Sequence, residues 1–410
     1  MALCLGISLV SRRDFILYDQ LVRYKWWYRN GYMSSTGRCF DIGAATSQSL
    51  QEFERRQQQF AIKYNIPFDQ LDFLSDPHLL ADFNVDCSED GAAGNGALMR
   101  LAPVPLFFHK HPAYAVEYSG ISGIITHGDL KAYDACRYYG ALIVAAVRGE
   151  TKEQLLDDNF YFKHETWFNN KKLVPEIMNI AQGSYKRNGG YDEGIRGKGY
   201  VANALEAALW AFWCDDGFFK TGALNAVNLG DDTDTTAAIY GQLAGAYYGY
   251  TNLPKKWVKH VYAHNFIMCL SKWILYEGQM WQSKSYTQNT SQLNFKPNSN
   301  VLTAVQSTAA RGLAPNTKRE YIQKPNAPLH QLTSNASRLP PNTKYPSVLY
   351  DAHGAALAAQ PDASLRPTIT AVPLGRYDPT RIGYTYTGAI HETKNYSDNR
   401  LRNPTNRSQV

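Results

Sequence analysis

Residues 226–250, with the sequence AVNLGDDTDTTAAIYGQLAGAYYGY, constrain the fold of this chain more than any other stretch. The polar side chains at its start are Asp231, Asp232, Asp234 and Thr235. The small residues behind them, at helical spacing, are Ala237, Ala238, Gly241, Ala244, Gly245 and Ala246. Acidic side chains suit the positive end of a helix, and small residues let other helices approach closely. The stretch therefore predicts a helix with an acidic start that is packed among other helices.

The acidic start of this helix has more than one interpretation. Carboxylates at i and i+2 with a hydroxyl at i+3 suit Mg²⁺ or Mn²⁺ better than zinc, so Asp232, Asp234 and Thr235 are candidate metal ligands. The residues alone equally allow ordinary helix caps. Residues 232–236 also fit the Asp-x-Asp-x-Thr pattern of haloacid-dehalogenase-type phosphatases. That pattern follows a buried β-branched strand, and no clear strand precedes it here, so the phosphatase interpretation ranks low.

Two glycine-containing loops carry further candidate binding residues. Gly94-Asn95-Gly96 lets the backbone turn tightly and approach a ligand, and the side-chain amide of Asn95 can both donate and accept hydrogen bonds. Taken alone, the same tripeptide also marks ordinary turns. The segment SSTGRCFDIG at 34–43 exposes N–H groups and hydroxyls that can hold phosphate or ribose oxygens. The plainer interpretation is a loop whose Asp41 caps the next helix.

Helical periodicity divides most of the chain into expected elements. We expect helices over 1–30, 44–63, 130–147 and 200–213, and one last amphipathic helix over 254–276. Asp129 is the expected cap of the helix that follows His127, and a histidine at a helix start is more often structural than a ligand. Residues 150–198 are polar and rich in Gly and Asn, which predicts a mobile surface connection.

Five segments, taken in order, resemble the ADP-ribosylglycohydrolase family. They are GYMSSTGRCFDIG at 31–43, AAGNGALMRLAPVPL at 92–106, THGDLKAYDACRYYGALI at 126–143, GYVANALEAALWAFW at 199–213 and NLGDDTDTTAAIYGQLAGAYYG at 228–249. The resemblance covers roughly residues 1–280. It implies an all-α, single-domain fold over 1–280 and a hydrolase that cleaves ADP-ribose linkages in an ADP-ribosylated protein or a small ADP-ribosyl compound.

The resemblance also implies roles for individual residues. Asp232, Asp234 and Thr235 would bind Mg²⁺ or Mn²⁺, of which family members hold two and this chain would hold one or none. The residues implied to line ADP-ribose are Gly94, Asn95, Gly96 and His127, with Ser35, Thr36 and Gly37 as neighbours. Asp90 lies four residues before Gly94, where family members often place an acid, and is a candidate catalytic residue.

Two motifs of the family are not found in these 410 residues. Family members carry a Gly-Asp-Ala-x-Gly-like motif and a Thr-Asp-Asp-Thr ahead of the segment that resembles MALCLGISLV here. The second motif supplies the other half of a dinuclear metal site. Two hypotheses therefore stay open: an enzyme whose N-terminal motifs are missing from the sequence, or a non-catalytic, ADP-ribose-binding or crystallin-like structural relative.

Composition separates the last third of the chain from the rest. From residue 285 onward 14 Lys/Arg face 6 Asp/Glu, a balance of +8, so the remainder carries 6 − 8 = −2 of the net charge of +6. We expect residues 281–410 to form a disordered, basic, low-complexity tail. The mildly acidic remainder predicts no specific nucleic-acid partner. No apolar run is long enough to span a bilayer, which predicts no membrane partner. Six scattered cysteines without a CxxC pair predict reduced thiols and a cytoplasmic location.

Overall fold

The computed structural model describes residues 1–283 and the backbone of two short strands, β1 (Leu349–Tyr350) and β2 (Ala356–Leu357). The strands pair antiparallel, with Leu349 opposite Leu357. Apart from residues 281–283 and these strands, the tail predicted over 281–410 lies outside the described residues.

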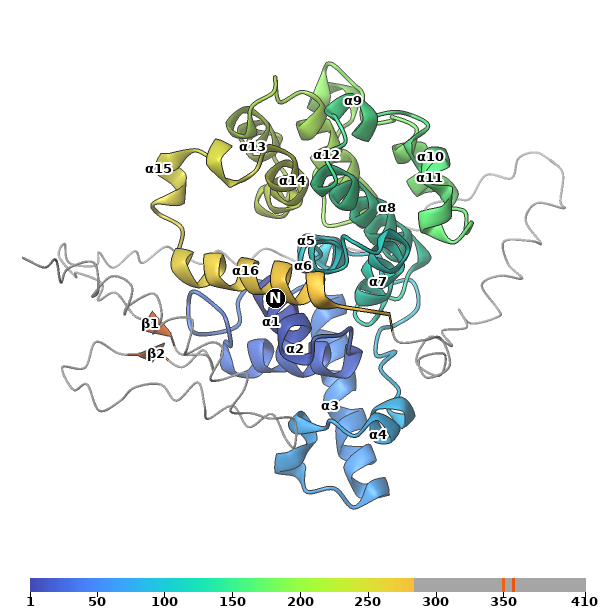
Figure 1. Ribbon diagram of the computed structural model, residues 1–410, viewed down its shortest axis with the longest axis vertical. Coiled ribbons are helices and arrows are strands. Elements are labelled where there is room, and N and C mark those ends of the chain that lie inside the picture. The colour runs from blue at the N-terminus through green and yellow to red at the C-terminus, as the bar shows by residue number, and fades with distance from the viewer. Residues whose placement is uncertain (284–348, 351–355, 358–410) are drawn as a thin grey trace, which may run out of the picture. The chain divides into compact units, whose positions relative to one another are not determined.

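Residues 1–283 consist of helices joined by loops, in the order seen in Figure 1. The α-helices are α1 (Ala2–Arg12), α2 (Leu17–Asn30), α3 (Ala44–Tyr64), α4 (Pro77–Asp82), α5 (Gly96–Met99), α6 (Pro103–Phe107), α7 (Pro112–Ile124), α8 (Leu130–Val147), α9 (Lys152–Leu155), α10 (Phe160–Lys163), α11 (Pro175–Ala181), α12 (Val201–Trp213), α13 (Phe219–Asn228), α14 (Thr233–Tyr248), α15 (Lys255–Val258) and α16 (His264–Met280). Short 3₁₀ turns are η1 (Phe68–Phe73), η2 (Glu165–Phe168), η3 (Gly190–Glu193) and η4 (Tyr250–Asn252). Within residues 1–283 no strand forms, which confirms the all-α prediction. None of the helices described is both long enough and apolar enough to cross a bilayer.

Helix α8 is the centre of the main core. Its residues 134–146 are all buried, and it packs against α7, α12 and α14. The sequence explains this position, because ALIVAA at 141–146 is apolar on every side and is best accommodated inside the protein. As predicted, Asp129 caps the helix, accepting a hydrogen bond from the Lys131 N–H at 2.7 Å.

Helix α16 lies between two groups of helices. Figure 1 shows α1 to α4 on one side of it and α7 to α14 on the other. Its contacts are with α1 and α6. A Cβ added at Gly278 would lie 2.2 Å from the carbonyl oxygen of Phe107, so only glycine allows α16 to cross α6 this closely.

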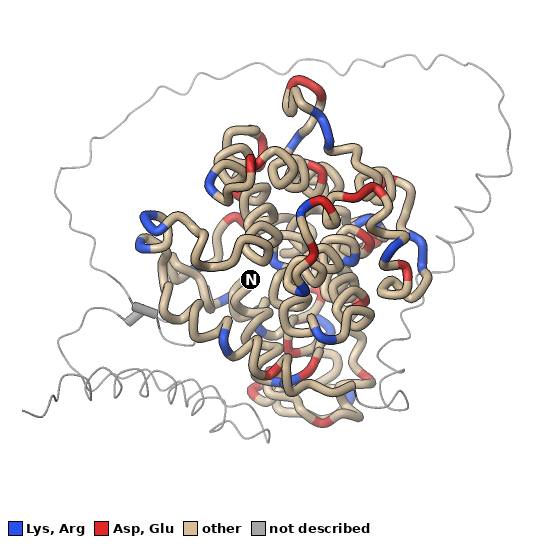
Figure 2. Tube along the Cα trace, turned by 45° about the horizontal axis from the view of Figure 1, so that its top comes forward, with Lys and Arg blue, Asp and Glu red and all other residues tan. Residues whose placement is uncertain are grey.

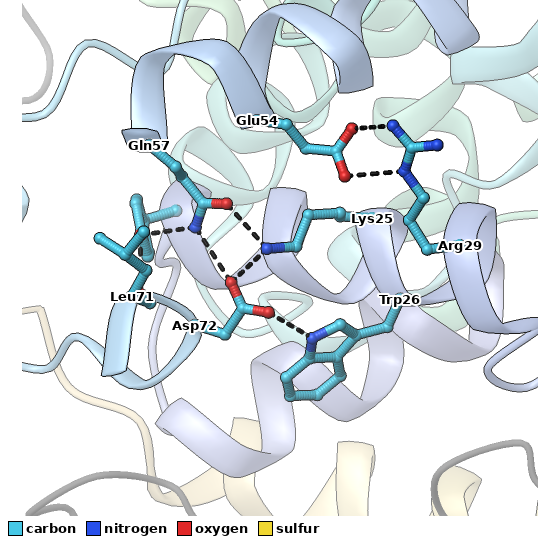
Figure 3. A network of polar contacts seen from close by, with 8 residues as sticks. Lys25, Trp26, Arg29, Glu54, Gln57, Leu71 and Asp72 are labelled. Atoms are coloured by element: carbon cyan, nitrogen blue, oxygen red, sulfur yellow. Dashed lines mark hydrogen bonds and ion pairs between the residues drawn. The ribbon is translucent and has the colours of Figure 1, made fainter. Parts of the chain in front are cut away.

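A polar network joins α2, α3 and η1 (Figure 3). Asp72 accepts hydrogen bonds from the indole of Trp26 at 2.7 Å and the amide of Gln57 at 3.1 Å, and it pairs with Lys25. Further along the same helices, Arg29 forms a two-bond pair with Glu54. These links fix the polar helix α3 against α2, and α3 brings its own first turn to the candidate site described below.

Three expectations about the fold are wrong. Residues 150–198 are not a surface connection, because Leu155, Phe160 and Ile177 of α9 to α11 and Tyr185 in the turn that follows lie in the main core. The helix expected over 254–276 is two helices, α15 and α16, separated at 259–263 by a break that ends with Ala263 in the left-handed region at φ 52°.

The third concerns only the two glycines of α14, since the helix packs among α8, α12 and α13 as expected and Ala244 is buried. A Cβ at Gly241 or Gly245 would meet nothing within 4 Å in the described part of the chain, so these glycines do not mediate close packing. The close approach comes from the partner helix instead. A Cβ at Gly222 of α13 would lie 2.4 Å from the hydroxyl of Tyr240 on α14.

A buried carboxylate shared by two arginines joins α1 to α2. Asp19 lies 2.8 Å from Arg12 Nε and 2.7 Å from Arg23 Nε, and all three side chains are almost wholly buried. Burial alone would raise the pKa of Asp19, but the charges of Arg23 and Arg12 outweigh it and lower the pKa from 3.8 to about 2. The carboxylate thus stays ionised well into the acid range.

We predict that Asp19→Asn lowers the free energy of unfolding by about 3–5 kcal/mol, because two buried guanidinium groups lose their shared carboxylate. Urea denaturation of both proteins measures this. Since the pKa of Asp19 in the folded state lies below its ordinary value, the difference in unfolding free energy between wild type and variant should be full above pH 3.8. It should shrink as the pH falls toward 2. Glu52→Gln, which breaks a more exposed pair with Arg55 and Arg56, should cost less than about 1 kcal/mol and serves as the control. Equal losses in the two variants would contradict the prediction.

Candidate functional site

The Gly94-Asn95-Gly96 loop is joined to the loop that precedes α12. The Asn95 N–H donates to the carbonyl of Gly199 at 2.9 Å, and the Val201 N–H donates to the carbonyl of Ala93 at 2.9 Å. The two loops therefore run antiparallel for a short distance, with Gly94 opposite Tyr200. This pairing brings two of the sequence motifs together.

The first turn of α14 is attached to both of these loops. The Asp232 N–H donates to the carbonyl of Gly197 at 2.6 Å, and the side-chain amide of Asn95 donates to Asp232 Oδ2 at 2.7 Å. The backbone just before the helix is in the left-handed region at Gly230 (φ 87°) and at Asp231 (φ 60°), where Asp is more tolerated than most residues. The turn thus places Asp232 beside the Gly-Asn-Gly loop across 137 residues of sequence.

His127 fills the space against the same loop. A Cβ at Gly94 or at Gly96 would lie 3.3 Å from the imidazole, so both glycines allow the ring to approach the backbone. The ring is only 3 % exposed, and its Nδ1 lies 2.8 Å from Thr126 Oγ1. Burial, and secondarily the positive charge of Arg100, lower its pKa from 6.5 to about 3. His127 is therefore a neutral side chain at physiological pH.

Helix α3 supplies a residue that the sequence analysis missed. Thr46 is buried, and its Oγ1 lies 3.6 Å from the position of a Cβ at Gly96. Ser49, one turn later, donates to the carbonyl of Thr126 at 3.2 Å. The only sequence signal for this placement is that α3 directly follows the glycine-containing loop.

That loop, which contains Ser35, Thr36 and Gly37, is closed on itself. Thr36 Oγ1 donates to the carbonyl of Arg38 at 3.0 Å, and a Cβ at Gly31 would meet the backbone of Gly37 at 2.3 Å. Ser35 and Thr36 are exposed. No hydrogen bond among residues 1–283 joins this loop to the Asn95–Asp232 pair, and Asp41 does not cap α3. The role of Ser35, Thr36 and Gly37 beside ADP-ribose stays a prediction.

The three candidate metal ligands share the first turn of α14 but differ in environment. Asp232 is half-buried, and one of its carboxylate oxygens accepts the hydrogen bond from Asn95. Asp234 is exposed, and Thr235 Oγ1 lies 3.7 Å from the sulfur of Met99. No group of three or more His, Cys, Asp or Glu side chains in the described part of the chain could hold a metal ion. The donor set of two carboxylates and a hydroxyl fits part of the oxygen coordination of a hard divalent ion.

Asp90 lies next to the His127 segment through its backbone. Asp90 and Gly128 form a parallel bridge, and the Gly128 N–H donates to Ser88 Oγ at 2.8 Å. The Asp90 residue is exposed. The structure thus places it at the edge of the group formed by Gly94, Asn95 and His127, and its catalytic role stays a prediction.

Comparison with known proteins identifies the family to which the chain belongs. The chain belongs to the ADP-ribosylglycohydrolase family, whose model matches residues 1–284. It is 33% identical over 279 residues to the ADP-ribosylarginine hydrolase Tri1 of Serratia proteamaculans, covering 67% of this chain and 65% of that protein. It is 36% identical over 265 residues to the protein of the same name from Pseudomonas putida, covering 64% of this chain and 60% of that protein.

More distant relatives and a solved structure complete the comparison. The ADP-ribosyl-[dinitrogen reductase] glycohydrolase of Rhodospirillum rubrum is 27% identical over 169 residues, covering 41% of this chain and 51% of that protein. A chain of a solved "ADP-ribosylglycohydrolase-related protein complex" superposes with a TM-score of 0.52 at 30% identity, covering 68% of this chain and 79% of that chain. The chain thus spans less than two thirds of the length of the two Tri1 proteins.

Gly197 is a second residue that the sequence analysis missed, and it yields a prediction. A Cβ at this position would lie 2.2 Å from Thr236 Oγ1, which itself donates to the carbonyl of Asp232 at 2.8 Å. We expect Gly197→Ala to displace the first turn of α14 and lower the unfolding free energy by about 1–3 kcal/mol. Gly199→Ala is the matched control, because its Cβ would meet nothing within 4 Å. Thermal denaturation compares the stability of the Gly197→Ala and Gly199→Ala variants. An equal loss of stability in both would contradict the prediction.

The buried His127 yields a second prediction. Its ring C–H chemical shift should stay constant by NMR from about pH 8 to about pH 4, whereas an ordinary histidine titrates within that range. The signal is assigned by its loss in His127→Asn. Because the folded-state pKa is below 6.5, the wild type should lose stability as the pH falls from 6.5 toward 3, and the variant should lose less. A shift change centred near pH 6.5 would show that the ring is exposed.

Proposed function

We propose that this chain is a hydrolase that removes ADP-ribose from arginine side chains of ADP-ribosylated proteins. The observation that carries the proposal is the Asn95–Asp232 hydrogen bond, which joins the Gly-Asn-Gly loop to the acidic start of α14 in one group with His127. Family membership supports the reaction class. The names of the two Tri1 relatives support arginine as the residue released.

The carboxylates of this group suit the charge that develops in such a reaction. Cleavage at the anomeric carbon of ribose passes through a centre that resembles an oxocarbenium ion. Asp232 is held in one orientation by the Asn95 amide, and Asp234 lies exposed in the same turn. The oriented Asp232 carboxylate would favour the positive charge at that carbon without having to reorganise, to the extent that a bound cation leaves it negative.

The neutral residues of the group suit binding rather than proton transfer. An imidazole with a pKa of about 3 cannot act as a general base near neutral pH, because its basicity is too low. It can instead pack against the sugar and exchange a hydrogen bond without charge. The glycines at positions 94 and 96 leave room for this ring against the backbone of the loop.

Asp232, Asp234 and Thr235 would hold Mg²⁺ or Mn²⁺, which when bound would orient the ribose hydroxyls and activate a water molecule. Asn95 then has a positioning role. With one Asp232 oxygen engaged by the amide, the other oxygen and the exposed Asp234 carboxylate remain for the cation.

The proposal is tested with an ADP-ribosylarginine peptide, an ADP-ribosylserine peptide and free ADP-ribose. We expect release of ADP-ribose from the arginine peptide in the presence of Mn²⁺, little from the serine peptide, and loss of release with a chelator. Asp232→Asn and Asp234→Asn should each lower kcat/KM by about a hundredfold or more. Asp216→Asn removes an exposed carboxylate outside this group and should have no effect.

The outcomes separate the proposal from its alternative. Titration calorimetry with free ADP-ribose reports binding independently of turnover. Binding without release from either peptide would identify a non-catalytic ADP-ribose-binding relative. Full activity in Asp232→Asn, or no binding of ADP-ribose at all, would reject the site.

A further inference from the structure

The segment 250–264 is a small loop closed at its base. The hydroxyl of Tyr250 and Nε2 of His264 are 2.8 Å apart, which joins the end of α14 to the start of α16. Between them lie η4 and the single turn of α15, which Figure 1 shows at the periphery of the helices. We refer to residues 250–264 as the α15 loop.

Positive charge is concentrated on this loop. Lys255, Lys256 and Lys259 are all exposed, and none of them forms an ion pair with a carboxylate among residues 1–283. The chain contains no Asp or Glu between Asp234 and Glu277, and Figure 2 accordingly shows blue and no red along the loop. Lys259 lies at the C-terminal end of α15, where the helix dipole favours positive charge, but a one-turn helix gains nothing from Lys255 and Lys256 at its first positions, where the dipole disfavours it. Local helix stability therefore does not explain them.

Apolar side chains are exposed among these lysines. Trp257 is 39% exposed and Val261 is 45% exposed, although both are apolar residue types that are usually buried. A tryptophan beside lysines and an aliphatic side chain is the composition found where proteins meet the interface of a bilayer, with the ring at headgroup depth and the amines on phosphate.

We propose that the α15 loop binds the anionic surface of a phospholipid bilayer. Its small size favours this partner over the alternatives. A stable protein interface buries about 1,200–2,000 Å² in total, more than one helical turn and its flanks can supply. Single-stranded nucleic acid is held by a groove that follows several phosphates, together with stacked aromatic faces. A lipid surface yields to a small projection and requires neither.

This is a peripheral contact, and it differs from the membrane-spanning segment that the sequence analysis excluded. Each lysine near an anionic bilayer strengthens binding by about fivefold, so three lysines would strengthen it by roughly a hundredfold, and Trp257 would add an apolar contact at the headgroups. The contact is independent of the proposed hydrolase site. Helix α14 separates the two, because Asp232 lies at its start and the loop follows its end.

The test is co-sedimentation of the full chain with vesicles of phosphatidylcholine alone and with phosphatidylserine added. We expect binding only to the anionic vesicles and weakening by salt. The triple variant Lys255→Ala, Lys256→Ala, Lys259→Ala should bind at least about tenfold more weakly. The control triple variant Lys63→Ala, Lys110→Ala, Lys172→Ala removes the same charge from exposed positions elsewhere and should bind like the wild type. The basic residues after 285 are identical in all of these proteins, so any difference arises from the loop.

Trp257→Ala separates a lipid contact from simple charge attraction. We expect it to weaken vesicle binding severalfold, including at salt concentrations that screen the lysines. Circular dichroism confirms that each variant is folded. The proposal is overturned by equal binding of the two triple variants, by wild-type binding of Trp257→Ala, or by a preference for a single-stranded oligonucleotide over anionic vesicles.

Discussion

The position of Asp232 is the constraint on which the candidate site depends. Its N–H is held by the carbonyl of Gly197 and its carboxylate by the amide of Asn95, while its carbonyl accepts from Thr236 within the helix. Each partner comes from a different part of the chain. The helix start, the Gly-Asn-Gly loop and the loop before α12 thus form one unit, and none can move without breaking a hydrogen bond to another.

Electrostatics divides this unit into two parts. The carboxylates of Asp232 and Asp234 lie at the half-buried and exposed edge, where charge is solvated at little cost. The inner side is formed by His127, which burial keeps neutral. A charged imidazole here would face the nearby Arg100 cation, so neutrality also removes a repulsion. The protein thereby combines an anionic edge with an uncharged inner side against the Gly-Asn-Gly loop.

The sequence predicted the elements better than their connections. Asp129 as a cap and the helices over 44–63 and 200–213 follow from local signals, and the structure contains them. Burial of 150–198 was not predictable from periodicity, because its core residues come from helices of one or two turns that show no repeat. The break before α16 depends on Ala263 in a left-handed conformation, for which alanine gives no signal.

The residue types of the candidate site were also visible in the sequence, but their pairing was not. Nothing local indicates that Asn95 binds Asp232, since 137 residues separate them. Gly197 was hidden in a glycine-rich segment, and its function becomes clear only when Thr236 is seen against it. Close packing between distant segments is a tertiary property, which explains why these contacts required the structure.

The imidazole between Gly94 and Gly96 has a consequence for how this chain could be altered by design or by evolution. A methyl group at either glycine would lie 3.3 Å from the ring, a tight contact that the ring relieves only by moving a few tenths of an ångström, so a side chain at 94 or 96 favours a smaller residue at 127. We therefore expect the effect of a change at any one of these three positions to depend on the residues at the other two. A library that varies them one at a time would sample mostly unfavourable combinations and would miss pairs that fit together.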